Sequence, residues 1–102
     1  MMIKKNMFTE VIDIIRERGK HYGTPDANYK RIAGLWSLIL KTNVTPKDVL
    51  LCMVATKLCR EIASHKRDNV IDMAGYLKLY LDMEDSCKKL TRQKKIKIMR
   101  KK

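Results

Sequence analysis

The chain has 102 residues, with 23 Lys or Arg against 11 Asp or Glu, and a formal net charge of +12. This length predicts one domain with a modest core, so a homo-oligomer is a natural source of further burial. The longest apolar run, residues 49–55, is far shorter than the roughly 20 residues of a membrane span, and we expect no span. Three cysteines without framework spacing, and no apolar signal segment near the start, favour the cytoplasm.

The positive charge is concentrated at the C-terminus. Residues 88–102 hold nine Lys or Arg and no acid, whereas residues 1–87 hold fourteen basic and eleven acidic residues. We therefore predict a helical domain over 1–87 and a basic tail, or fifth helix, over 88–102. A solvated tail is the plainer interpretation, and contact with nucleic acid or a host protein is the alternative.

Two helices are predicted first. Phe8, Val11, Ile12 and Ile15 repeat at helical spacing, and Gly19 is expected to end this helix in a left-handed conformation. The second helix opens with a capping hydroxyl followed by proline, at Thr24-Pro25. Its apolar stripe is Tyr29, Ile32, Ala33, Trp36, Ile39 and Leu40.

A third helix begins in the same way at Thr45-Pro46, where Asp48 completes a capping-box pattern. Its expected core face is Val49, Leu50, Met53, Val54, Leu58 and Ile62, and Cys52 and Cys59 are expected to be core side chains as well.

The fourth helix is expected to start near Asp68-Asn69. It carries an apolar set made up of Val70, Met73, Ala74, Leu77, Tyr80 and Leu81. Linkers of about four to six residues favour antiparallel neighbours, so the predicted fold class is all-α, a compact bundle of four main helices.

Polar residues gather where the third helix meets the fourth. Lys57 lies beside an apolar stripe and needs a partner, for which Asp72 is the first candidate and Asp68 the next. With Arg60 and Asn69, these residues either form a structural lock or hold an anionic ligand. Capping at the start of the fourth helix also accounts for Asn69 and Asp72.

Aromatic and amide side chains could complete such a ligand site. Tyr76 follows Asp72 by one helical turn, and the loop before the second helix carries His21, Tyr22 and Asn28. A phosphate donor, a stacking ring and the amides of a helix start are the groups that bind nucleotides. The alternative is an ordinary connection between helices.

Metal binding depends on which chemistry the protein performs. Asp68 and Asp72 are four residues apart and could hold Mg²⁺ against a phosphate, if the protein is a hydrolase. Otherwise no cofactor is expected.

The motifs resemble those of small all-helical proteins of bacteriophages and prophages with no assigned function. The motifs that carry the resemblance are Tyr22-Gly23-x-Pro25-x-x-Asn28, Lys57-x-x-Arg60 and Asp68-Asn69-x-x-Asp72-x-Ala74-Gly75-Tyr76. The resemblance implies a protein of the bacterial host cytoplasm.

The chain is more distantly similar to nucleoside triphosphate pyrophosphohydrolases of the MazG and dimeric dUTPase type. In those proteins acidic motifs hold Mg²⁺, whereas Lys57 and Arg60 here replace acids by cations. The resemblance therefore implies nucleotide binding more than magnesium-dependent hydrolysis.

The resulting hypothesis is a phage-type protein that binds a phosphate-bearing nucleotide or related small anion at this corner and sequesters it. A Mg²⁺-dependent pyrophosphohydrolase, and a nucleic-acid or host-protein module acting through the tail, are the alternatives.

Overall fold

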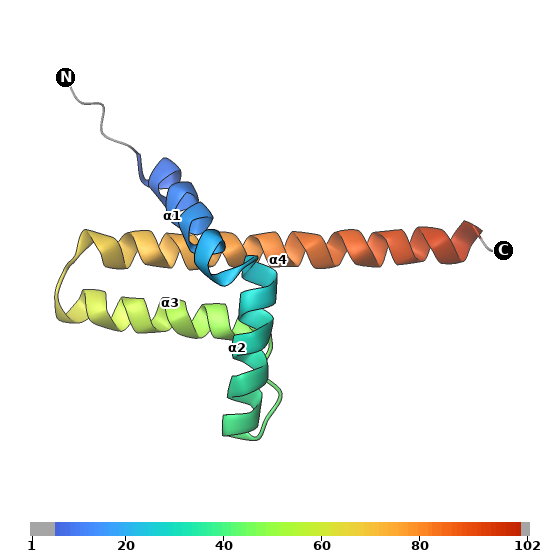
Figure 1. Cartoon of the computed structure of the whole chain (residues 1–102), viewed down its shortest axis with the longest axis horizontal. Helices are drawn as coiled ribbons and strands as arrows, with labels where there is room; N and C mark the ends of the chain where they lie inside the picture. Colours follow the sequence, from blue (N-terminus) through green and yellow to red (C-terminus); the bar gives the residue numbers. More distant parts are fainter. Residues whose placement is uncertain (1–5, 101–102) are drawn as a thin grey trace.

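The computed structural model describes the backbone of residues 6–100 and the side chains of residues 6–84. Four helices make up this part, with no strand in it: α1 Met7–Tyr22, α2 Pro25–Leu40, α3 Pro46–Ala63 and α4 Arg67–Arg100 (Figure 1). The all-α prediction is therefore confirmed. None of the described helices has the length and apolarity needed to cross a membrane.

The helix starts follow the capping residues in the sequence. Thr24 accepts a hydrogen bond from the Ala27 amide at 3.2 Å, as predicted for the start of α2. At the start of α3, Thr45 accepts from the Asp48 amide at 3.2 Å, while the Asp48 carboxylate accepts from the Thr45 amide at 3.0 Å. The predicted capping box is confirmed.

The predicted end of α1 is wrong. The helix passes through Gly19 and continues to Tyr22, and the residue with positive φ is Gly23, at 80°. The Gly23 amide donates to the Gly19 carbonyl at 3.1 Å. This bond closes a further helical turn, which would be missing if the helix ended at Gly19.

The fourth helix is longer than expected. It begins at Arg67 and its backbone continues to Arg100, so residues 88–100 extend α4 and form no separate helix. The side chains of the basic tail fall outside the described residues.

Two of the helices pair side by side, and the other two cross them. Figure 1 shows α3 antiparallel to the first half of α4, with α1 and α2 crossing that pair and the far ends of α2 and α4 extending beyond it. The core contains the fully buried Val49 and Leu50, and Trp36 packs against it. The other buried members of this cluster are Tyr29, Ala33, Tyr76 and Met83.

Parts of the predicted apolar stripes are not buried. Leu58 and Ile62 are 48% and 78% exposed, and Cys52 and Cys59 are exposed too, so their assignment to the core is wrong. The same correction applies to Phe8, Ile12, Ile39, Leu40, Val70, Leu77 and Leu81. The physical reason is that α1 and α2 cross the α3–α4 pair, which leaves each helix fewer covered faces than parallel packing provides.

Candidate functional site

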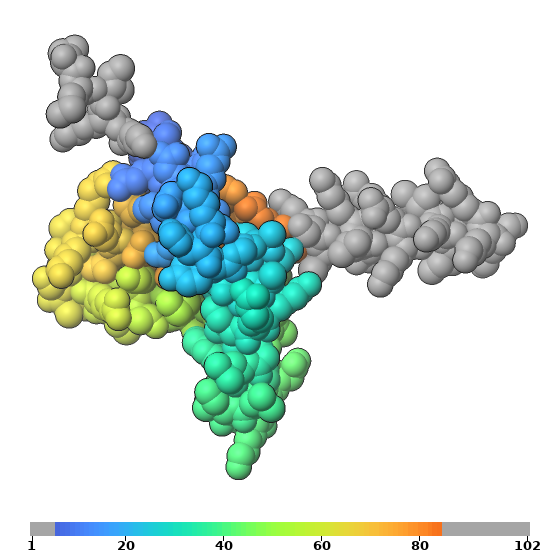
Figure 2. Space-filling view, in the orientation of Figure 1, coloured from blue at the N-terminus to red at the C-terminus, as the bar shows by residue number. Residues whose placement is uncertain are grey.

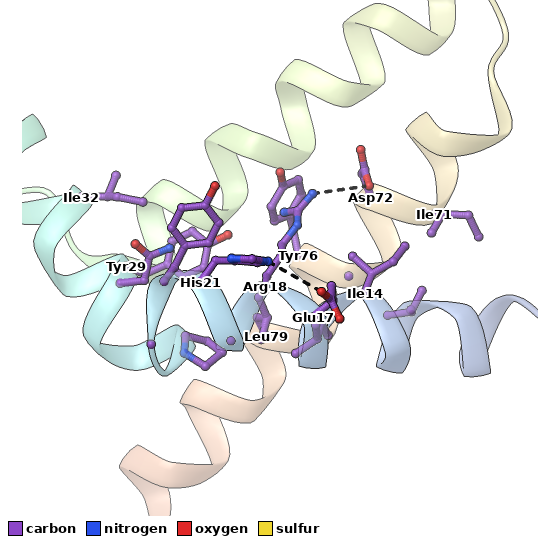
Figure 3. A pocket seen from close by; sticks show the side chains of 18 residues that line it. Ile14, Glu17, Arg18, His21, Tyr29, Ile32, Ile71, Asp72, Tyr76 and Leu79 are labelled. Carbon is purple, nitrogen blue, oxygen red and sulfur yellow. Dashed lines mark ion pairs between the residues drawn. The ribbon is translucent and has the colours of Figure 1, made fainter.

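A cleft of about 550 Å³ lies between α1, α2 and the first half of α4 (Figure 3). Its volume lies within the range of roughly 300 to 1,000 Å³ typical of small-molecule sites. The walls are mainly apolar, from Val11, Ile14, Ile15, Ile32, Ile71 and Leu79. The polar and aromatic lining comes from Glu17, Arg18, His21, Tyr22, Asn28, Tyr29, Asp72 and Tyr76.

Asp72 is the polar centre of this region. Its Oδ2 lies 2.9 Å from Nζ of Lys57, and its Oδ1 lies 3.9 Å from the nearer guanidinium nitrogen of Arg18. The side chains of Lys57 and Asp72 are each 16% exposed. One carboxylate therefore faces two cations, which leaves a positive charge uncompensated among these three groups.

Arg18 is the more accessible of the two cations. Its side chain is 50% exposed, and Figure 3 shows the guanidinium beside Tyr76 and Asp72. A hydrogen bond to Tyr76 raises the pKa of Arg18, burial opposes this rise, and nearby Asp72 adds to it. The guanidinium therefore stays charged while part of its donor set faces the cleft.

The tyrosines beneath Arg18 are buried. Tyr29 is 7% and Tyr76 is 5% exposed. Burial raises the pKa of Tyr29, the neighbouring Tyr76 raises it further, and Arg18 lowers it in part. The inner wall of the cleft thus combines the two buried phenol rings with the guanidinium of Arg18.

Arg18 is not among the residues predicted for the site, although the sequence contains a signal for it. Val11, Ile14, Ile15 and Arg18 follow one another at helical spacing, so this arginine continues the apolar stripe of α1. Lys57 continues an apolar stripe of α3 in the same way, and it was predicted for the site on that ground.

The loop residues predicted for the site do line the cleft. His21 and Tyr22 are in edge-to-face contact with ring centroids 6.3 Å apart, and Nε2 of His21 lies 3.6 Å from Glu17. The guanidinium of Arg31 donates to the Tyr22 carbonyl at 2.9 Å, which ties the end of α1 to α2. Tyr22 remains 59% exposed at the cleft. Asn28 lines the cleft from α2.

The start of α2 has fewer free backbone amides for binding an anion than its sequence suggests. The Ala27 and Asn28 amides are both taken by Thr24, the first by its hydroxyl and the second by its carbonyl, and Pro25 has no amide hydrogen. At most one amide of the first turn faces outward, so the charge of the site comes from side chains.

The other predicted residues lie outside the cleft. Arg60 and Asp68 are exposed, and neither lines it. Asn69 is 6% exposed, and its side chain contributes to lowering the pKa of Glu61 on α3. The predicted residues therefore fall into two groups. Those at the cleft are His21, Tyr22, Asn28, Asp72 and Tyr76, with Lys57 bound to Asp72. Those outside it are Arg60, Asp68 and Asn69.

At the α3–α4 corner, polar groups contact one another within the corner. Oε1 of Glu61 accepts from the Lys66 amide at 2.9 Å and lies 2.7 Å from Nδ1 of His65. The cost of desolvation raises the pKa of Glu61, but the hydrogen bonds from His65, Lys66 and Asn69 lower it by more. The carboxylate of Glu61 is therefore taken up by the connection between the two helices.

A metal site requires more donors than the described side chains bring together. No group of three or more His, Cys, Asp or Glu able to hold an ion occurs among them. Of the two predicted magnesium ligands, Asp72 faces two cations and Asp68 lies outside the cleft.

Comparison with known proteins identifies the family. A family model described as a domain of unknown function, DUF6378, matches residues 6–84, so the chain belongs to this family. It is 41% identical over 61 residues to the Gene 55 protein of Mycobacterium phage D29, covering 59% of this chain and 40% of that protein. It is also 34% identical over 74 residues to the Gene 55 protein of Mycobacterium phage L5, covering 70% and 47%. No solved structure matches the chain.

These relatives agree with the predicted kinship to phage proteins of unassigned function. The chain spans less than half the length of either phage relative.

Proposed function

We propose that this phage-type protein binds a small phosphate-bearing ligand of nucleotide type in the cleft between α1, α2 and α4, and sequesters it. This moves the centre of the hypothesis from the α3–α4 corner to the cleft, with Asp72 and Tyr76 common to both. The relatives in mycobacteriophages support a role in the bacterial host cytoplasm.

The observation that carries the proposal is the half-exposed Arg18. Its nearest carboxylate oxygen is 3.9 Å away, and Lys57 holds the other oxygen of that carboxylate at 2.9 Å. A guanidinium has five donors in a planar fork that matches phosphate oxygens. Arg18 can therefore turn donors toward an anion while Lys57 keeps Asp72 neutralised.

The remaining lining suits the other parts of a nucleotide. The exposed ring of Tyr22 offers a surface for stacking a base, and Asn28 offers both donors and an acceptor for a base or sugar. The apolar walls from α1 and α4 exclude water from the rest of the ligand.

Calorimetry and thermal-shift measurements with nucleoside mono-, di- and triphosphates and cyclic dinucleotides test this proposal. We expect Arg18→Met to weaken binding by about ten- to a hundredfold, because hydrogen bonds to a charged group contribute about 1.5 to 3 kcal/mol. Arg16→Met is the matched control, since Arg16 is an exposed arginine of the same helix that does not line the cleft. Equal affinity in the wild type and Arg18→Met would contradict the proposal.

The same samples separate sequestration from hydrolysis. Binding that is unchanged by a chelator, with the nucleotide recovered intact, supports sequestration. Release of pyrophosphate that requires Mg²⁺ and is lost in Asp72→Ala would instead support the pyrophosphohydrolase alternative.

A further inference from the structure

Helix α3 is apolar on two opposite faces. One face packs into the core through Val49, Leu50, Met53 and Val54. The other consists of four exposed residues that we call the outer seam: Leu51, Ala55, Leu58 and Ile62. The three larger members are 47%, 48% and 78% exposed. A helix that is apolar all round is normally buried all round.

The spacing within the outer seam is that of a coiled coil. Its members follow each other at intervals of four, three and four residues, which is the a/d repeat of helices that pack by knobs into holes. The core face of α3 packs against α4 and α2. The seam is therefore a second packing surface with no partner among the described residues.

We propose that the outer seam packs antiparallel against the same seam of a second copy of this chain. A two-fold axis passing between residues 55 and 58 sets Ala55 of each copy opposite Leu58 of the other, and Leu51 opposite Ile62. A small side chain then meets a large one at the two central Ala55–Leu58 contacts, and two large side chains pack together at each outer Leu51–Ile62 contact. A parallel pair would set Ala55 against Ala55 and leave a void there.

The charges of α3 permit this contact between two positively charged chains. The outer seam has no charged member, and one edge of it is formed by the exposed, uncharged Cys52 and Cys59. Of the nearby cations, Lys57 points to the other side of α3, where it pairs with Asp72. Repulsion between like charges is therefore low where the two helices meet.

The shape of the molecule offers additional area beside the seam. The outer seam lies opposite the face of α3 that packs into the core. Figures 1 and 2 show the last turns of α2 projecting past α3 on the side away from α4. These turns carry Leu35, Leu38 and Ile39, which are 59%, 76% and 67% exposed. The seam spans only about 17 Å of helix, so these side chains help it approach the roughly 800 Å² per chain of a standard interface.

Light scattering coupled to size exclusion tests the proposal on the full chain. We expect a particle of twice the 12.0 kDa chain mass, and a dissociation constant raised about 100-fold or more in Leu58→Asp, because the carboxylate is buried without a partner. Phe8→Asp is the control, since Phe8 is 71% exposed on α1, away from the seam. Circular dichroism verifies that each variant is folded. A monomeric wild type, or a Leu58→Asp variant that dimerises normally, overturns the proposal.

Thiol crosslinking tests the antiparallel direction. A two-fold axis across antiparallel helices brings their equivalent edges together, so Cys52 of one copy lies near Cys59 of the other. In a Cys87→Ser background, mixing Cys52→Ser and Cys59→Ser chains with a short bismaleimide should give more covalent dimer than either chain alone. Stronger crosslinking within each separate variant than in the mixture overturns the antiparallel arrangement.

Discussion

Asp72 has two cationic neighbours of different kinds. Lys57 is held at 2.9 Å and is 16% exposed, whereas Arg18 is 3.9 Å away and half exposed. The Lys57 contact has the geometry of a structural ion pair. The Arg18 contact leaves guanidinium donors available for a ligand. The same carboxylate therefore contributes to stability through α3 and to the cleft through α1.

Replacement of Asp72 by Asn should destabilise the fold by about 2 kcal/mol, because Lys57 is left mostly buried without a counter-charge. Urea unfolding measures this change. The double variant Lys57→Met, Asp72→Asn should recover part of the loss, since both charges are then removed. If Asp72→Asn is as stable as the wild type, the ion pair does not support the fold.

The three shorter helices each begin at a residue whose side chain accepts a backbone amide. These caps, at Asn6, Thr24 and Thr45, rest on hydrogen bonds between residues three apart. The pattern is local, so it can be read from the chain. The end of α1 also depends on one residue, but two glycines competed for that role and only Gly23 has positive φ.

The capping box of α3 predicts a pH dependence. Hydrogen bonds from the Thr45 amide and hydroxyl hold the pKa of Asp48 below its ordinary value. A lowered pKa in the folded state means that the carboxylate stabilises the protein above its unfolded pKa, and that this contribution is lost as the pH falls through the folded pKa. We expect Asp48→Asn to be less stable than the wild type at about pH 7, and the difference to shrink at about pH 3. Chemical unfolding at both pH values measures this, and a constant difference would contradict it.

At the scale of the whole molecule, the core of the described part and the basic segment occupy different stretches of α4. Met83, at 8% exposed, is the last buried residue among the described side chains, and the backbone of α4 continues from it to Arg100. We therefore expect truncation to separate the stability of the domain from the C-terminal charge.

Because the sequence predicts residues 88–102 to be a tail outside the helical domain, truncation after Cys87 should change the free energy of unfolding by less than about 0.5 kcal/mol, the usual size of a surface effect. Any retention of DNA or RNA by the full chain at low salt should be lost, because nine cations are removed. Unfolding and nucleic-acid retention measured on the same sample separate the two effects. A truncated protein that still binds nucleic acid would point to the helical domain instead.

The sequence by itself determined the all-α class, the starts of α2 and α3, and most of the central core. It also indicated that Lys57 needs a partner such as Asp72. The class, the helix starts and the core faces depend on hydrogen bonds and spacings within a few residues of one another, and Lys57 stood out because it lies beside the apolar stripe of its own helix. Only the tertiary structure decided that Arg18 joins Asp72, that Arg60 and Asp68 stay outside the cleft, and that Leu58 and Ile62 face outward. Those outcomes depend on the angles at which the helices cross, and an amphipathic pattern does not specify which of two apolar faces a neighbour will cover.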